Sequence, residues 1–176
     1  MELKPQDLLV LLKAKAHPGQ RWTYAALAAA LYMSPSQVHA SVKRATAAGL
    51  SVVRGRGDWA PVRPALLEFV VHGARYVWPA MTGPVKRGVP TSFGAEPLAK
   101  HITAAPNEAP VWAHPAGSAK GPSLSPLYRT APAAALADPA LHRLLALLDA
   151  VRVGRVRERT LAVDLLRREI EATDAK

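Results

Sequence analysis

Apolar residues recur at helical spacing near the start of the chain. One helical face is marked by residues at positions i, i+1, i+4 and i+8, namely Leu8, Leu9, Leu12 and Ala16. Pro5 suits the first turn of a helix, because its missing N–H would have no helical partner there. The pattern predicts a helix from about Pro5 to Lys15 with one buried face.

Two shorter helices are predicted between residues 23 and 48, separated by a tight break at Tyr32-Met33. Thr23 is a good N-cap for the first of them. Ser34 and Gln37 have the spacing of a capping box at the start of the second. Its inward stripe is Val38, Ser41, Val42 and Ala45. The outward face is then Ser36, Gln37, His39, Ala40, Lys43 and Arg44.

A short hairpin is predicted after these helices. Gly49 suits a left-handed helix end. Ser51–Val53 and Asp58–Ala60 are the expected strands, joined by the basic glycine loop Arg54-Gly55-Arg56-Gly57. Helix, turn, capped helix, strand and basic loop follow one another in the layout of a winged helix-turn-helix, which places a helix in the DNA major groove.

The rest of the chain divides into two kinds of sequence. Pro64 begins a largely apolar helix that Gly73 is expected to end. Ten prolines then fall between residues 79 and 132 and exclude a long helix, although interleaved aromatic residues favour an ordered, irregular extension. Asp138-Pro139 starts a Leu-rich helix, and Gly154 separates it from a final helix that reaches about Ala172.

The predicted fold is therefore mainly α, in three parts. Residues 1–62 form a winged helix-turn-helix domain. Residues 63–132 form a helix and an ordered proline-rich extension. Residues 133–176 form a C-terminal helical hairpin.

Charge is unevenly distributed along the 176 residues, whose formal net charge is +10 and whose pI is near 10.4. Residues 1–63 hold nine Lys or Arg against three Asp or Glu, a net +6, whereas residues 131–176 are nearly balanced at +1. The excess coincides with the predicted helix-turn-helix, which favours a polyanionic partner for that part.

Particular side chains in this part suit contacts with double-stranded DNA. Gln37, His39 and Lys43 are candidates for base edges, because amide and cationic groups match purine acceptors and donors in the major groove. Hydroxyls and backbone N–H groups at helix N-termini suit phosphates, and the candidates are Thr23, Ser34 and Ser36. Arg54 and Arg56 are expected to reach phosphates or the minor groove from the tip of the hairpin, and Arg44 is expected to contact phosphate from the helix.

Residues 5–62 resemble the winged helix-turn-helix of bacterial MarR-type regulators. The matching pieces are Trp22-Thr23-Tyr24-Ala25-Ala26-Leu27-Ala28, Ser34-Pro35-Ser36-Gln37-Val38-His39, and Lys43-Arg44-Ala45 through Ala48-Gly49-Leu50. The resemblance implies sequence-specific DNA binding as a homodimer and a role in transcription, most simply as a repressor. The chain departs from that family after the hairpin, where the long proline-rich segment begins.

Other classes of protein receive little support. Cysteine is absent, six histidines are scattered without metal-ligand spacing, and Walker A, G-x-G-x-x-G, H-E-x-x-H and G-x-S-x-G motifs are missing. We therefore expect no enzymatic activity, no cofactor and no metal site. The chain lacks a signal-peptide pattern and any run of 18 apolar residues, so we expect a cytoplasmic protein that does not enter membranes.

Two alternatives remain open. Residues 79–176 are able to wrap a protein partner, as in an antitoxin that inhibits its partner and autoregulates its own operon through the DNA-binding domain. A structural adaptor that uses the winged helix only for protein contacts is the other alternative, and weak, salt-insensitive DNA binding would favour it.

Overall fold

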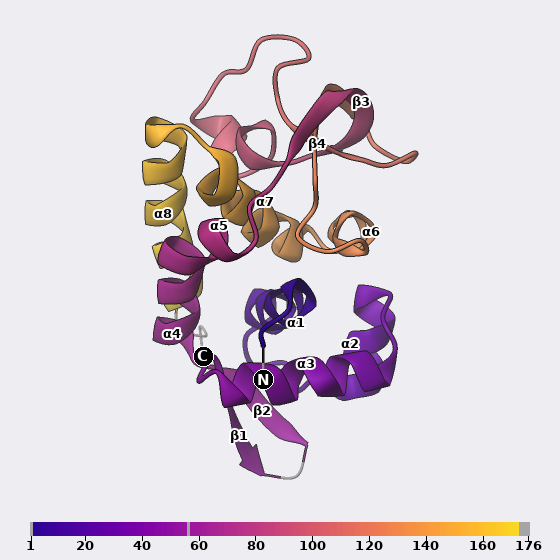
Figure 1. The fold of residues 1–176 in the computed structure, drawn as a ribbon, viewed down its shortest axis with the longest axis vertical. Helices are drawn as coiled ribbons and strands as arrows, with labels where there is room; N and C mark the ends of the chain where they lie inside the picture. The colour runs from indigo at the N-terminus through magenta and orange to yellow at the C-terminus, as the bar shows by residue number, and fades with distance from the viewer. Residues whose placement is uncertain (1, 56, 173–176) are drawn as a thin grey trace.

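The structure, a computed structural model, describes residues 2–55 and 57–172. Helices account for 54% and strands for 16% of the chain, and the strands lie in two small sheets. The composition is thus mixed α/β, with helices predominant, rather than mainly α as predicted. Figure 1 shows the N-terminal helices and one hairpin in the lower part, and the second sheet with the C-terminal helices above them.

Three helices open the chain at nearly the predicted bounds: α1 (Pro5–Ala16), α2 (Tyr24–Leu31) and α3 (Pro35–Ala47). Both predicted N-caps are confirmed. The Thr23 hydroxyl accepts the Ala26 N–H at 3.1 Å, and the Ser34 hydroxyl accepts the Gln37 N–H at 3.2 Å. These bonds satisfy N–H groups that a helix leaves unpaired at its start.

The predicted hairpin is also present, as β1 (Ser51–Gly55) and β2 (Asp58–Pro61), paired antiparallel with Val53 opposite Trp59. Gly49 precedes it with a φ of +75°, the left-handed conformation that glycine adopts without steric cost. The expected helix end at Gly49 is therefore confirmed.

The helix expected from Pro64 is longer than predicted. It begins as α4 (Arg63–Glu68), continues through a π-helical turn at Phe69–Gly73 and ends as α5 (Ala74–Val77). Gly73 does not end it, because the chain stays helical there and keeps a buried stripe of Leu66, Val70 and Ala74 at four-residue spacing.

The proline-rich segment is ordered but not irregular throughout. It contains β3 (Thr82–Pro90), β4 (Val111–Ala113) and β5 (Ala119–Leu124), each paired with the other two, and short 3-10 turns at Ser92–Gly94 and Leu98–Lys100. Pro84 lies where the β3–β5 register shifts, a position at which a missing N–H costs no ladder hydrogen bond. The prediction missed these strands because proline masks strand periodicity.

The C-terminal hairpin is confirmed as α7 (Pro139–Val153) and α8 (Val156–Glu171). A further helix, α6 (Ala131–Ala137), precedes it and was not predicted. Asp138 separates α6 from α7 and caps α7, since its carboxylate accepts the N–H groups of Ala140 and Leu141. None of the helices in residues 2–55 and 57–172 is both long and apolar enough to cross a bilayer.

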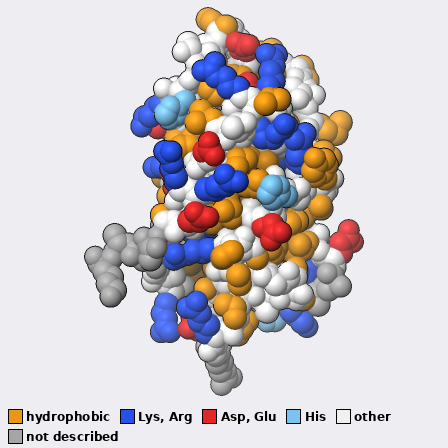
Figure 2. All heavy atoms as spheres, turned by 90° about the vertical axis from the view of Figure 1, so that its left-hand side faces the viewer, with side chains coloured by type: hydrophobic (Ala, Val, Ile, Leu, Met, Phe, Trp, Pro, Cys, Tyr) orange, Lys and Arg blue, Asp and Glu red, His pale blue; other side chains and the backbone are white. Residues whose placement is uncertain are grey.

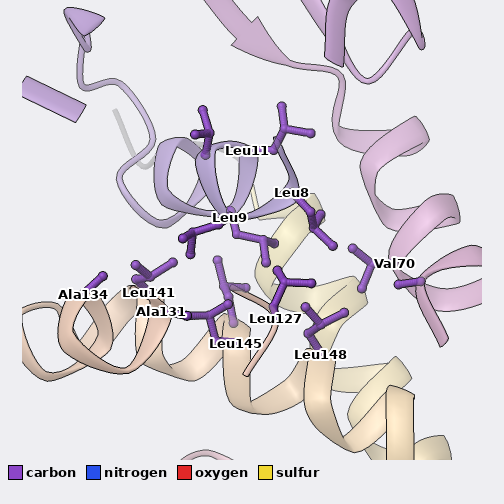
Figure 3. Close-up of a cluster of buried hydrophobic side chains, with 14 of the residues drawn as sticks. Leu8, Leu9, Leu11, Val70, Leu127, Ala131, Ala134, Leu141, Leu145 and Leu148 are labelled. Atoms are coloured by element: carbon purple, nitrogen blue, oxygen red, sulfur yellow. The ribbon is translucent and has the colours of Figure 1, made fainter. Parts of the chain in front are cut away.

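Helix α1 lies at the centre of the core, in contact with both α3 and α7. Its residues 8–12 are fully buried, so it is covered all round rather than on the one predicted face. Figure 3 shows Leu8 and Leu9 directed toward Leu141, Leu145 and Leu148, with Val70 at the edge of the same cluster. The N-terminal helices and the C-terminal hairpin therefore share one core.

A buried polar network fastens the β3–β5 sheet to α7. The Asp149 carboxylate accepts hydrogen bonds from the Thr91 hydroxyl at 2.9 Å and the Trp112 indole at 2.7 Å, and it pairs with Arg152 at 2.7 Å. Burial raises the pKa of Asp149, against the opposing effect of Arg152. Each of these polar groups is satisfied, which is the condition for keeping such a network in a core.

Candidate nucleic-acid interface

Helix α3 has one face that the rest of the protein leaves uncovered. Val38, Ser41, Val42 and Ala45 are buried, as predicted, against the core. Ser36, His39 and Lys43 are exposed on the other side, spaced by three and four residues so that they form one row along the helix. Figure 1 shows α3 running across the lower part of the molecule, with the β1–β2 hairpin projecting below it.

Thr23 and Ser34 are exposed at the starts of α2 and α3. Their hydroxyl oxygens already accept N–H groups of their own helices, as described above. A hydroxyl in this position still has its proton to donate, so each of the two remains able to hydrogen-bond a phosphate oxygen.

Gln37 is less available than the sequence suggests. Its side-chain oxygen accepts the Ser34 N–H at 2.9 Å, and its amide nitrogen lies 3.5 Å from the Tyr128 hydroxyl. The side chain is half-buried. A bidentate contact with adenine needs both amide atoms, so this rotamer would have to change before Gln37 could make one.

His39 is exposed and packs edge-on against the Tyr24 ring, with ring centroids 5.2 Å apart. The contact joins α3 to the first turn of α2 and fixes the position of the imidazole ring. Lys43, one turn later, is exposed, and this leaves its ammonium group in solvent.

The structure corrects the expectation for Arg44, which does not face outward. Its guanidinium forms a bidentate pair with Asp7, with Nη2–Oδ1 at 2.6 Å and Nε–Oδ2 at 2.8 Å. The Arg44 side chain is 12% exposed and that of Asp7 is fully buried. Hydrogen bonds to Asp7 raise the pKa of Arg44 against the effect of burial. Arg44 therefore ties α3 to α1. The helical spacing predicted that Arg44 would share the solvent-exposed face with Lys43, and this prediction was wrong.

The β1–β2 hairpin, whose first strand contacts α3, carries a further exposed cation. Arg54 is exposed in β1, whereas Arg56 lies outside the described residues. Arg21, which the sequence analysis did not single out, is also exposed and sits near this hairpin, with a 3.4 Å contact to Asp58 of β2. The signal available in the sequence was a basic residue two positions before the predicted N-cap Thr23.

The sequence-predicted residues thus fall into three groups. Ser36, His39 and Lys43 share one exposed face of α3, with the caps Thr23 and Ser34 at helix ends. Gln37 and Arg44 are engaged inside the protein. Arg54 stands apart on the hairpin. The described residues contain no cluster of three or more His, Asp or Glu side chains able to hold a metal ion.

In comparisons with known proteins, no family model, curated protein or solved structure matches the chain.

Proposed function

We propose that residues 1–62 form a winged helix-turn-helix that binds double-stranded DNA, and that the protein regulates transcription, acting as a repressor. The observation that carries the proposal is the uncovered face of α3, with Ser36, His39 and Lys43 in one row, and with the hairpin that carries the exposed Arg54 packed against the same helix. An α-helix fits the width of the major groove, where such side chains meet base edges.

The charge distribution supports the same conclusion. Most of the net positive charge belongs to residues 1–63, and Lys43 and Arg54 are exposed there. Cationic side chains that neutralise DNA phosphates release the counterions condensed on them. The affinity for DNA is therefore expected to fall steeply as the salt concentration rises. In this proposal α3 reads bases while Arg54 and the helix N-termini at Thr23 and Ser34 hold the backbone.

The test is fluorescence anisotropy with purified protein, comparing the DNA upstream of its own gene with a random duplex at two salt concentrations. Preferential, salt-sensitive binding of the upstream DNA supports a regulator. Binding that is weak, non-selective and insensitive to salt contradicts it and favours the adaptor.

Lys43→Ala gives a sharper test. We expect about a tenfold loss of affinity for the preferred duplex and reduced discrimination against random DNA, as when a cation at a base edge is removed. Arg157→Ala is the control, since it removes an exposed charge from the start of α8, which lies in the upper part of the molecule in Figure 1, whereas α3 lies in the lower part. Equal losses in both variants would show that only net charge matters.

A protein contact is the second candidate, because large apolar side chains lie uncovered beyond α4. Tyr76 is 75% and Met81 76% exposed, and Val77 is exposed beside them. Figure 2 shows apolar side chains among basic and acidic ones on the face that includes α4 and α8. Such residues suit either a second copy, as a homodimeric repressor needs, or the separate partner of an antitoxin. The mass in solution distinguishes them: a dimer of this chain alone favours the first.

A further inference from the structure

The two-stranded ribbon formed by β3 and β5 carries two cations directly opposite each other. Its register places Arg87 across from Lys120, and both residues are exposed. In an antiparallel pair, opposite residues point to the same face of the ribbon with their Cβ atoms about 5 Å apart. Like charges in such positions repel each other and weaken the pairing of the strands. A ligand therefore explains this pair better than the stability of the fold does.

No ion pair neutralises these cations within the part of the chain that the structure describes. The sequences of β3, β4 and β5 contain no Asp or Glu, and a third exposed cation, Lys86, lies in β3. The acids nearest to these strands in the sequence are engaged elsewhere: Glu96 pairs with Lys100, and Glu108 accepts a backbone N–H. The positive charge of the ribbon is thus left for a partner to neutralise.

Arg87 is held in position for such a partner. Its Nε donates to the Gly117 carbonyl at 3.0 Å, and among the described residues its two terminal nitrogens have no acceptor. The turn that supplies this carbonyl packs tightly on β3, since a Cβ at Gly117 would lie 2.0 Å from the carbonyl carbon of Gly88. A guanidinium fixed in this way loses little conformational freedom when it binds an anion, so the ribbon is preorganised for one.

The surface of the ribbon indicates which anion it suits. Trp112 is buried, so β3, β4 and β5 expose no aromatic side chain of the kind that anchors a protein partner. Val85 is the single large apolar side chain that these strands expose, whereas a lipid surface is bound through several. A guanidinium and an ammonium group side by side match phosphate oxygens, which a DNA backbone presents in a regular series. Double-stranded DNA is the partner that fits these features best.

The ribbon lies far from the helix proposed to read DNA bases. Figure 1 shows β3 in the upper part of the molecule, whereas α3 and the β1–β2 hairpin lie in the lower part. Duplex DNA is stiff over about 150 base pairs, so a duplex that crosses α3 does not turn back over the molecule to reach the ribbon. Two separate stretches of DNA are needed to occupy both surfaces.

We propose that the β3–β5 ribbon binds the phosphate backbone of double-stranded DNA, so that one molecule holds two stretches of duplex at once. Arg87 and Lys120 contact the backbone of one stretch without selecting its sequence, and α3 reads the other. The joining of two stretches rests on the proposed function, because it requires α3 to bind DNA. The contact between the ribbon and DNA does not depend on α3.

The test is the capture of a fluorescent duplex by a second duplex fixed on beads, with the purified full chain as the link. The fixed duplex is the DNA upstream of the gene, and the fluorescent duplex has a random sequence. We expect the wild type to capture the fluorescent duplex. The double variant Arg87→Gln/Lys120→Gln should capture at least about tenfold less, since two phosphate contacts are lost, while it still binds the fixed duplex.

A matched control and a charge reversal separate this contact from general effects. Arg157→Gln/Arg168→Gln removes two exposed charges from α8, on the left of Figure 1 and away from β3 on the right, and should capture like the wild type. Lys120→Glu places opposite charges across the strand pair. It should therefore raise the melting temperature and yet abolish capture, which a merely structural role of Lys120 would not produce.

Three results overturn the proposal. The first is that Arg87→Gln/Lys120→Gln or Lys120→Glu captures like the wild type. The second is that the α8 control loses as much as the ribbon variant, which would leave only net charge. The third is that the ribbon variant loses binding to phosphatidylserine vesicles but not to DNA, which would assign the ribbon to a membrane surface.

Failure of the proposed function gives a different result. If α3 does not bind DNA, Lys43→Ala should bind the upstream duplex as the wild type does. Arg87→Gln/Lys120→Gln should then still weaken the binding of random duplex about tenfold in anisotropy titrations. That combination would overturn the role of α3 and support the ribbon as a DNA-binding surface.

Discussion

At the scale of single residues, the Arg44–Asp7 pair shows how one side chain changes role between sequence and structure. On a helical projection Arg44 follows Lys43 and belongs to the same outer face. In the fold, the long Arg44 side chain reaches back to a buried carboxylate on α1 and bonds it twice. A bidentate pair of this kind holds two helices in a fixed relation.

Arg44→Ala should therefore destabilise the protein by about 3 kcal/mol, because it leaves the Asp7 charge buried without its cationic partner. Urea unfolding measures the change in the free energy of unfolding. Lys43→Ala is the control, since an exposed neighbour should change it by less than about 0.5 kcal/mol. Where Arg44→Ala remains folded, it should bind DNA like the wild type. A variant that loses DNA affinity but keeps its stability would instead support the expectation from the sequence that Arg44 contacts a DNA phosphate.

At the scale of elements, the helix starts were the most predictable features, because their chemistry is local. The Ser34–Gln37 capping box forms within one turn and needs no other part of the chain. The proline-rich segment was less predictable. Its strands β3, β4 and β5 are defined by pairing with one another, across as many as 42 residues from Thr82 to Leu124, rather than by their own pattern.

Ser34→Ala should lower the free energy of unfolding by about 1 kcal/mol, the usual cost of removing a helix N-cap. Ser36→Ala, two residues later on the exposed face, has no such bond and should be close to neutral. Thermal or urea unfolding of the two variants measures the difference. Equal stabilities would mean that the capping box contributes nothing to the start of α3.

At the scale of the whole molecule, one carboxylate joins the N-terminal helices to α7. Asp138 accepts hydrogen bonds from Lys13 at 2.6 Å and His17 at 2.7 Å, besides capping α7. Burial acts to raise the pKa of Asp138, but the bonds from Lys13 and His17 hold it below its ordinary value of 3.8 on balance. The charged form is thus favoured by folding.

This shift predicts a dependence of stability on pH. Because the folded-state pKa of Asp138 is lowered, its contribution is fully present above about pH 5 and is lost as the pH falls through the folded-state pKa. Asp138→Asn keeps a helix cap but removes the charge beside Lys13, so it should cost about 3 kcal/mol at pH 7. It should also flatten the decline of stability below pH 5 in urea titrations.

Asp164→Asn is the control, because Asp164 is an exposed acid with a 3.6 Å contact to Arg167. It should change stability at pH 7 by less than about 0.5 kcal/mol and leave the acid decline as it is. An Asp138→Asn protein with an unchanged acid decline would show that other carboxylates cause it.

The sequence by itself determined the local features of this protein: three N-terminal helices, the N-caps of the second and third, the hairpin, the C-terminal hairpin of helices and the excess of positive charge in the first 63 residues. These follow from periodicity, capping and turn chemistry, which act over a few residues. Of the candidate site, the exposed positions of Ser36, His39 and Lys43 follow from the same periodicity.

Only the tertiary structure decided what meets across the chain. It placed Arg44 on Asp7, Gln37 beside Tyr128 and Asp149 under the Trp112 indole, all at separations of 37 residues or more. The physical reason is that burial and pairing of polar groups depend on which segments approach one another, and a local pattern carries no information about the partner that a side chain will find.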